Sequence, residues 1–148
     1  MNHVATKGDF YISTNNALLD IKAIHHFLSE ESYWAKGISY QLVEKSITNS
    51  FCFGVYYKSK TIGLARLITD KTAFAYLCDV YIDKDYRGQG LAKWLLQTVH
   101  NHPDLQGLRR WLLMTRDANN LYANFGWEPI CEDQSKRMMQ LHHPNVYK

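Results

Sequence analysis

The segment that most constrains how this chain can fold is residues 82–92, IDKDYRGQGLA. An apolar, strand-like run over residues 73–82 leads into it, and a helical pattern begins at its end. That helix has one apolar face, made of Leu91, Ala92, Leu95, Leu96 and Val99. The segment therefore predicts a strand, a glycine-bearing turn and a helix in direct succession.

The turn in this unit has the chemistry of an anion site, because the first N–H groups of a helix lack partners within it. The helix dipole adds about half a positive charge at the same end. Gly88 and Gly90 let a ligand approach the backbone without a Cβ in the way, and Arg87 adds a charged donor. We expect residues 87–92 to bind a pyrophosphate. There are two simpler alternatives. The glycines form a plain tight turn, or Arg87 makes an ion pair with an aspartate of the preceding turn.

The glycine spacing excludes two common phosphate-binding motifs. No Lys-Ser or Lys-Thr pair follows the last glycine, and Lys93 stands where the dinucleotide fingerprint has its third glycine. The segment instead resembles motif A, V-x-x-x-x-R-G-x-G-x-G/A, of the GNAT superfamily of acetyl-CoA-dependent N-acetyltransferases. The matching residues are Ile82, Arg87, Gly88, Gly90 and Ala92. Residues 118–127 are similar to that family's A-x-x-L-Y-x-x-x-G-F segment, so the resemblance rests on two motifs in the expected order.

Composition and length indicate one globular domain over residues 1–148, with a loose tail from about residue 142. Apolar residues make up 46% of the chain and charged residues 21%, which is ordinary for such a domain. We expect no membrane partner, because no 18-residue apolar run exists. A net charge of +3 is too small to indicate nucleic-acid binding. The N-terminus lacks a signal-peptide pattern, so we expect a cytoplasmic protein.

The cysteines and histidines predict no metal site. Cys52, Cys78 and Cys131 cannot all pair and lack ligand spacing, so we expect buried thiols in a reducing compartment. The two histidine pairs are adjacent in sequence, and adjacent residues do not share a helix or strand face.

Periodicity and turn residues predict a β-α-α-β-β-β-α-β-α-β-β order. The expected strands are residues 9–13, 51–57, 61–69, 73–82, 108–115, 128–130 and 137–141. The first expected helix follows Asp20, and the others cover residues 40–48, 91–101 and 118–125. We expect the second helix to face inward with Tyr40, Val43 and Ile47. Residues 30–37 are expected to form a loop. This order resembles the GNAT fold, an α+β (mixed α/β) architecture with a mixed, mostly antiparallel sheet flanked by helices. The resemblance implies that strands 73–82 and 108–115 splay apart around acetyl-CoA.

The resemblance also implies how the cosubstrate acetyl-CoA is held. Its pyrophosphate would meet the backbone of Arg87, Gly88, Gln89, Gly90, Leu91 and Ala92. Its pantetheine arm would pair, like an additional strand, with the backbone near Tyr81 and Ile82. The family attacks the thioester directly in a ternary complex, and no Ser-His-Asp or Cys-His arrangement is evident here.

Tyr122 is the candidate general acid, because it matches the family tyrosine near the CoA sulfur. A thiol has a pKa of about 8.5 and a phenol about 10, so the phenol is protonated at neutral pH and can serve the departing thiolate. The alternative is a core tyrosine that shares an apolar face with Leu121 and Phe125. Thr115 stands where the family often has an asparagine that contacts pantetheine.

Asp79 is the candidate for binding or deprotonating the acceptor amine. It is the only carboxylate in the central strand pattern, and a buried acid without a partner is unfavourable. In polyamine-acetylating relatives an acid occurs at the matching place. The alternative is a structural carboxylate bonded to backbone amides or to an arginine. Tyr76 occupies the position where some protein-lysine acetyltransferases carry a catalytic glutamate, so a copy of that mechanism is not expected.

The family's acceptor pocket uses the loop between the first two helices, here residues 32–36. Tyr33 and Trp34 in this loop are able to enclose an aliphatic or cationic amine, although both also suit a core. The sequence therefore predicts an N-acetyltransferase for a primary amine of a small molecule or peptide, and a homodimer is possible. The alternative is a catalytically silent acyl-CoA-binding or regulatory module, which needs neither Tyr122 nor Asp79.

Overall fold

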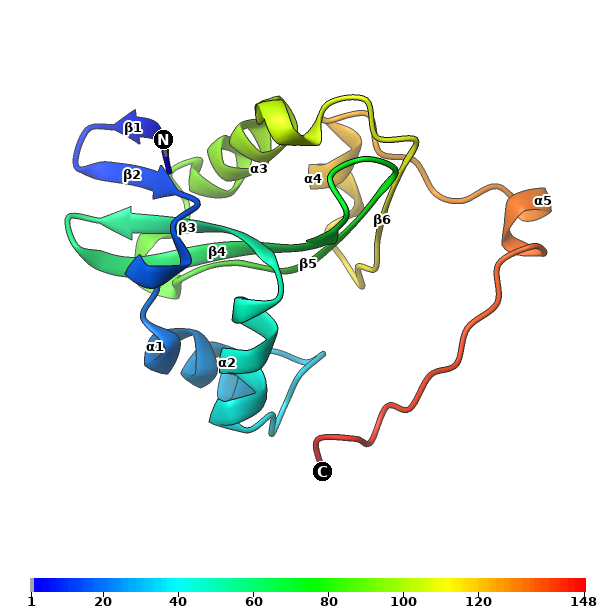
Figure 1. The fold of residues 1–148 in the computed structure, drawn as a ribbon, viewed down its shortest axis with the longest axis horizontal. Helices are drawn as coiled ribbons and strands as arrows, with labels where there is room; N and C mark the ends of the chain where they lie inside the picture. The colour runs from blue at the N-terminus through cyan, green and yellow to red at the C-terminus, as the bar shows by residue number, and fades with distance from the viewer. Residues whose placement is uncertain (1) are drawn as a thin grey trace.

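A six-stranded sheet forms the centre of the computed structural model, which describes residues 2–148 (Figure 1). Its strands lie in chain order: β1 (His3–Lys7), β2 (Phe10–Ser13), β3 (Phe51–Tyr57), β4 (Lys60–Thr69), β5 (Phe74–Ile82) and β6 (Arg110–Leu113). Neighbouring strands are antiparallel except β5 and β6, which are parallel. The predicted α+β class with a mixed, mostly antiparallel sheet is confirmed.

Helices cover both faces of this sheet (Figure 1). On one face lie α1 (Ile21–His26), its continuation η2 (Phe27–Glu31) and α2 (Tyr40–Thr48), and on the other lie α3 (Leu91–Asn101) and α4 (Asn119–Ala123). Three short 3₁₀ turns, η1 (Asn16–Leu18), η3 (Lys84–Tyr86) and η4 (Pro103–Leu105), and a last helix, α5 (Glu132–Ser135), complete the elements. Each face of the sheet has its own apolar core.

Four local predictions are wrong. The strand predicted at residues 9–13 forms as β2, but it is not the first, because residues 3–7 precede it as β1 and pair with it in a hairpin. The first helix runs on through a π-helical turn to Glu31, so residues 30 and 31 are not loop. Tyr40 is exposed, at the outer surface of α2. Cys131 is exposed and Cys78 half-buried, and only Cys52 is a buried thiol.

The two strands predicted at residues 128–130 and 137–141 do not form. Residues 128–148 contain only α5, and their side chains are almost all exposed. The strand-like sequence of these residues has no sheet edge beside it within this chain, and a strand needs a paired neighbour to satisfy its backbone.

The place where β5 and β6 separate defines the site. Residues 74–77 of β5 pair with residues 110–113 of β6, and the rest of β5 has no partner strand on that side among residues 2–148. The backbone groups of residues 78–81 that point away from β4 are therefore not used by a neighbouring strand and are able to meet a ligand. The pairing matches the divergence that the family resemblance implies.

A β-bulge at Asp79 reshapes the same strand. Leu64 pairs with Tyr81 and Arg66 with Cys78, so β5 has one residue more than β4 over this interval. Asp79 adopts a positive φ of 47°, a region in which Asp and Asn are tolerated better than most residues. The bulge brings the Asp79 side chain to Arg66 of β4.

Candidate active site

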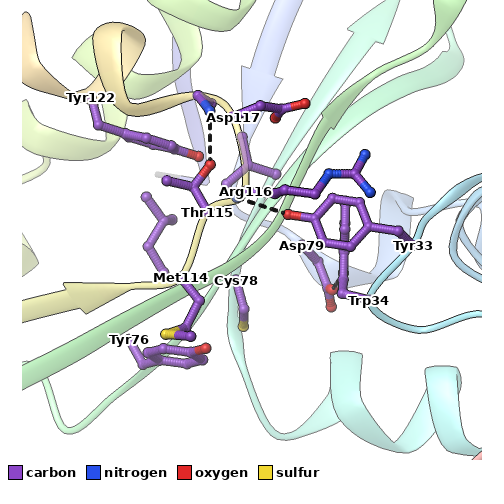
Figure 2. Close-up of a pocket in the computed structure, with 13 residues that line it drawn as sticks. Tyr33, Trp34, Tyr76, Cys78, Asp79, Met114, Thr115, Arg116, Asp117 and Tyr122 are labelled. Atoms are coloured by element: carbon purple, nitrogen blue, oxygen red, sulfur yellow. Dashed lines mark hydrogen bonds between the residues drawn. The ribbon is translucent and has the colours of Figure 1, made fainter. Parts of the chain in front are cut away.

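A cavity of about 440 Å³ opens where β5 and β6 diverge (Figure 2). Its walls come from β5, from the loop between η2 and α2, and from the segment between β6 and α4. Four predicted site residues lie in its lining: Tyr33, Trp34, Asp79 and Tyr122. Tyr76, Cys78, Met114, Thr115 and Arg116 line it too. Residues far apart in sequence thus converge on one concave surface, the usual form of a small-molecule site.

The Asp79 carboxylate is buried and held by two charged or polar donors. Arg66 Nε donates to Asp79 Oδ2 at 2.6 Å, and Trp34 Nε1 donates to Oδ1 at 2.6 Å. Arg66 Nη1 also donates to Ser50 Oγ at 3.0 Å. Burial alone would lower the pKa of Arg66, but the neighbouring Asp79 carboxylate raises it above its ordinary value, so the guanidinium stays charged. These contacts match the structural-carboxylate alternative, while Asp79 still lines the cavity.

Tyr33 ties the two sides of the cavity together. Its hydroxyl oxygen accepts a hydrogen bond from the Arg116 backbone N–H at 3.1 Å, and the Arg116 guanidinium lies 3.9 Å from the centre of its ring. Its ring also meets that of Trp34 edge-on, with centroids 5.0 Å apart. The loop after η2 is therefore anchored both to β5, through Trp34, and to the segment after β6, through Tyr33.

Tyr122 lies at the boundary between the cavity and the core. Its side chain is buried, its ring packs edge-on against Trp127 at 5.9 Å, and its hydroxyl end points toward Thr115 in the cavity wall (Figure 2). Burial, and then the neighbouring Tyr33, raise the pKa of Tyr122 above its ordinary value, so the phenol stays protonated at neutral pH. Tyr122 therefore both packs in the apolar core and lines the cavity.

The predicted pyrophosphate turn lies at the N-terminus of α3, outside the lining of this cavity. Gly88 and Gly90 each have φ of 82°, and an added Cβ at either would meet no atom within 4 Å. Arg87 Nε donates to the Ile82 carbonyl at 2.8 Å, which fixes the turn and leaves its other guanidinium nitrogens available. Among the ion pairs of residues 2–148, none joins Arg87 to an aspartate of the preceding turn.

Neither Tyr81 nor Ile82 lines the cavity between β5 and β6, so on that side of the sheet they are able to offer a ligand only their backbone. The Tyr81 ring stacks on Phe27 with centroids 3.8 Å apart, on the α1 face, where it lines a second cavity of about 310 Å³. Burial and the nearby carboxylate of Asp83 raise its pKa. Ile82 packs into the core beneath α3.

Arg66 and Arg116 are the site residues that the sequence analysis missed. Arg66 is the only charged residue in the predicted strand 61–69, so it carried the same signal as Asp79 on the neighbouring strand. Reading the two together predicts an ion pair between adjacent strands. Arg116 carried no comparable signal, because its role depends on how the segment after β6 meets Tyr33.

Cys78 is a poor nucleophile although it lines the cavity. Burial raises the pKa of its thiol to about 12, so almost none is thiolate at neutral pH. Within residues 2–148, no three His, Cys, Asp or Glu side chains are grouped to hold a metal ion. No described helix is both long and apolar enough to span a bilayer.

Comparison with known proteins identifies the family. The model of the acetyltransferase (GNAT) domain matches residues 16–144, so this chain belongs to the GNAT acetyltransferase family. A Gibberella zeae protein provisionally assigned as an acetyltransferase is 34% identical over 150 residues, covering 86% of this chain and 84% of that one.

Two solved structures are informative. A GNAT-family protein of Xanthomonas campestris pv. campestris, provisionally assigned as an acetyltransferase, is 43% identical, with a TM-score of 0.89 over 96% of this chain and 99% of that one. A GNAT acetyltransferase from Elizabethkingia anophelis with acetyl-CoA bound shares the fold at 16% identity, with a TM-score of 0.59 over 80% and 76% of the two chains.

Proposed function

We propose that this protein transfers an acetyl group from acetyl-CoA to a primary amine of a small molecule or peptide. The observation that carries the proposal is the cavity at the divergence of β5 and β6, with Tyr122 in its wall. Family membership supports acetyl transfer, and the acetyl-CoA bound to a protein of the same fold supports the donor.

The residues present fit acetyl-CoA. Gly88 and Gly90 hold the turn in a left-handed conformation, and the space in front of both is open to a phosphate. The helix that follows has eleven residues, long enough for its N-terminal N–H groups to favour an anion. The unpaired part of β5 leads from this turn to the cavity, so the pantetheine arm is able to bond to its backbone like an added strand.

The proposed reaction is direct attack. The neutral amine nitrogen bonds to the thioester carbonyl carbon, the carbon–sulfur bond breaks, and the electron pair leaves with sulfur. The Tyr122 hydroxyl donates its proton to that thiolate, and the phenolate regains a proton from the attacking nitrogen through water. A protonated phenol at the start is favoured by the raised pKa of Tyr122. The poorly ionised Cys78 thiol argues against an acyl-cysteine intermediate.

We assign Asp79 to acceptor positioning and not to proton removal. Both of its oxygens already accept hydrogen bonds, one from a guanidinium and one from the Trp34 indole. A carboxylate bonded in this way holds the Trp34 indole at the cavity wall. Tyr33 and Trp34 would then contact the carbon chain of the acceptor.

Free-thiol release from acetyl-CoA, measured across amines, polyamines, amino acids and lysine peptides, tests the proposal. We expect turnover with one class, and Tyr122→Phe should lower kcat by ~10²-fold while leaving the calorimetric affinity for CoA unchanged. Tyr76→Phe, in the same cavity, is the matched control and should change kcat little. An unchanged kcat in Tyr122→Phe would remove its acid role. CoA binding without turnover on any amine would favour the silent module.

A further inference from the structure

Arg116 brings a positive charge to the wall of the candidate active site. It lies in the segment between β6 and α4 and lines the cavity. Among the ion pairs of residues 2–148, none includes Arg116. Its one hydrogen bond within the described residues comes from its backbone N–H and not from its guanidinium. The guanidinium N–H donors are therefore available to a ligand.

The carboxylates of the cavity wall do not neutralise this charge. Asp79 already faces Arg66, and Trp34 donates to its second oxygen. Asp117 is the other acidic residue in the lining, and it makes no ion pair with Arg116. Figure 2 shows its carboxylate directed away from Tyr122. The side of the cavity that faces Tyr33 and Trp34 therefore carries an uncompensated positive group.

The Tyr33 ring holds that group in place. Cζ of Arg116 lies 3.9 Å from the centre of the ring. A guanidinium stacked on an aromatic ring uses its flat face, and its N–H donors, which lie in its plane, remain open to other partners. Two parallel N–H donors match the two oxygens of a carboxylate. The contact with Tyr33 thus fixes the guanidinium without using the donors that would recognise an anion.

The backbone around Arg116 is fixed as well. The Arg116 N–H donates to the Tyr33 hydroxyl at 3.1 Å, and the Ala118 N–H donates to Thr115 Oγ1 at 3.0 Å, which closes a turn around Arg116. Tyr33 in turn packs edge-on against Trp34, which is hydrogen-bonded to β5. A cationic group held in this way loses little conformational freedom when a ligand binds, and such preorganisation favours affinity.

The position of Arg116 separates it from the predicted pyrophosphate turn. Tyr33 lies in the loop between η2 and α2, so the guanidinium stacked on it is on the face of the sheet that α1 and α2 cover. Gly88 and Gly90 lead into α3, which covers the opposite face (Figure 1). We therefore expect the anion at Arg116 to belong to the acceptor and not to the pyrophosphate of CoA.

The rest of the cavity favours a short carbon chain. Apart from its few polar groups, the lining is apolar or aromatic, with Leu77, Val80, Met114 and Trp34 among its residues. The whole cavity is about 440 Å³, and the thioester end of a bound acetyl-CoA would take up part of it. An acceptor that suits the remainder is small, with an amine at one end, a carbon chain and an anionic group.

We propose that the acceptor is a small amino carboxylate, whose carboxylate binds the Arg116 guanidinium while its amine attacks the thioester beside Tyr122. The inference rests on the proposed acetyl transfer and names the class of amine. The bonds that form and break are those of the direct attack, with the amine nitrogen acylated and the thiolate protonated. The carboxylate takes no part in these steps and serves only to place the amine.

Kinetics with matched acceptors test this recognition. Glycine, β-alanine and γ-aminobutyrate are each compared with the corresponding amide, and the ratio of kcat/KM for acid and amide is measured. The wild type should prefer at least one acid to its amide. Arg116→Gln keeps the backbone N–H that Tyr33 accepts and should lower this ratio by about 10–100-fold, the range for hydrogen bonds to a charged group. Intrinsic differences between two amines cancel, because both proteins meet the same pair.

Two further variants separate the guanidinium from a general effect of charge. Arg116→Lys keeps the charge without the planar pair of donors, so it should lose part of the preference. Arg110→Gln removes the same charge from an exposed residue of β6 outside the cavity lining and should keep the wild-type ratio. A wild type that prefers every amide, or an unchanged ratio in Arg116→Gln, would overturn the proposal.

Calorimetry distinguishes failure of this proposal from failure of acetyl transfer. CoA, which has no acetyl group to transfer, is bound first, and the same acids and amides are then titrated into the complex. The wild-type complex should bind at least one acid more tightly than its amide, and Arg116→Gln should lose that difference while binding CoA itself as the wild type does. This result without turnover in the kinetic assay would support the recognition and contradict the transfer. No binding of any acid, or weakened CoA binding in Arg116→Gln, would overturn the assignment of Arg116 to the acceptor.

Discussion

Replacing Asp79 by asparagine tests the buried ion pair that organises the candidate active site. The side chains of Arg66 and Asp79 are 14% and 6% exposed, and their contact is 2.6 Å. Asparagine keeps the size and tolerates the positive φ of Asp79, so neither a cavity nor new backbone strain is created. The change removes the charge and replaces one acceptor oxygen by an NH2 group, which then faces the N–H donor of either Arg66 or Trp34.

The expected loss follows from what remains after the change. Arg66 stays buried and positive, loses the carboxylate charge opposite it, and keeps its hydrogen bond to Ser50. Removing one member of a buried pair typically destabilises a protein by 3–5 kcal/mol, and the partial exposure of Arg66 favours the lower end, about 3 kcal/mol. For a chain of this length, that loss lowers the melting temperature by about 6–12 °C.

Urea unfolding followed by circular dichroism would measure the loss. The matched control is Asp104→Asn, whose pair with Lys71 is about half exposed and should contribute no more than about 1 kcal/mol. Adding Arg66→Met to Asp79→Asn removes the unpaired charge and should restore part of the stability. A loss in Asp79→Asn no larger than in Asp104→Asn would show that the pair is not an important buried interaction.

Two further predictions concern the turn before α3 and a buried histidine. Gly90→Val should weaken CoA binding by about 10–100-fold in calorimetry, the range for lost hydrogen bonds to a charged group. The control is Gly107→Val, which is also at a positive φ with open space and should bind CoA with wild-type affinity. If the Gly90→Val protein binds CoA as tightly as the Gly107→Val protein, the turn before α3 is not the phosphate site. His100 accepts a hydrogen bond from Trp127 Nε1, and burial lowers its pKa. The unfolded chain therefore binds this proton more readily, so stability is complete above pH 6.5 and falls as the pH drops through the lowered value. In urea unfolding measured at several pH values, His100→Gln should reduce this loss of stability at low pH. His142→Gln, in the exposed C-terminal segment, should leave the loss unchanged. If His100→Gln also leaves it unchanged, other groups cause the loss.

Local patterns in the sequence were sufficient for much of the fold. The succession of β5, the glycine turn and α3 is encoded within a short segment, by alternation, by glycines and by one apolar helix face. The bounds of α2 and β3 were predicted correctly for the same reason, since their signals are repeated over neighbouring residues. Asp79, Tyr33, Trp34 and Tyr122 were singled out in advance, and the fold brings all four to one cavity.

Contacts between distant residues could not be predicted in this way. The bulge that directs Asp79 to Arg66 depends on the register of two strands, and the hydrogen bond from Trp34 depends on a loop 45 residues away in the chain. Whether Asp79 is a free base or a bonded carboxylate is decided by those contacts.

Residues 137–141 show the same division most clearly. The sequence by itself determined that residues 137–141 have the character of a strand, because that character is local. Only the tertiary structure decided that no strand forms there, because a strand requires a neighbouring edge, and residues 137–141 pair with none of the six strands that the structure describes.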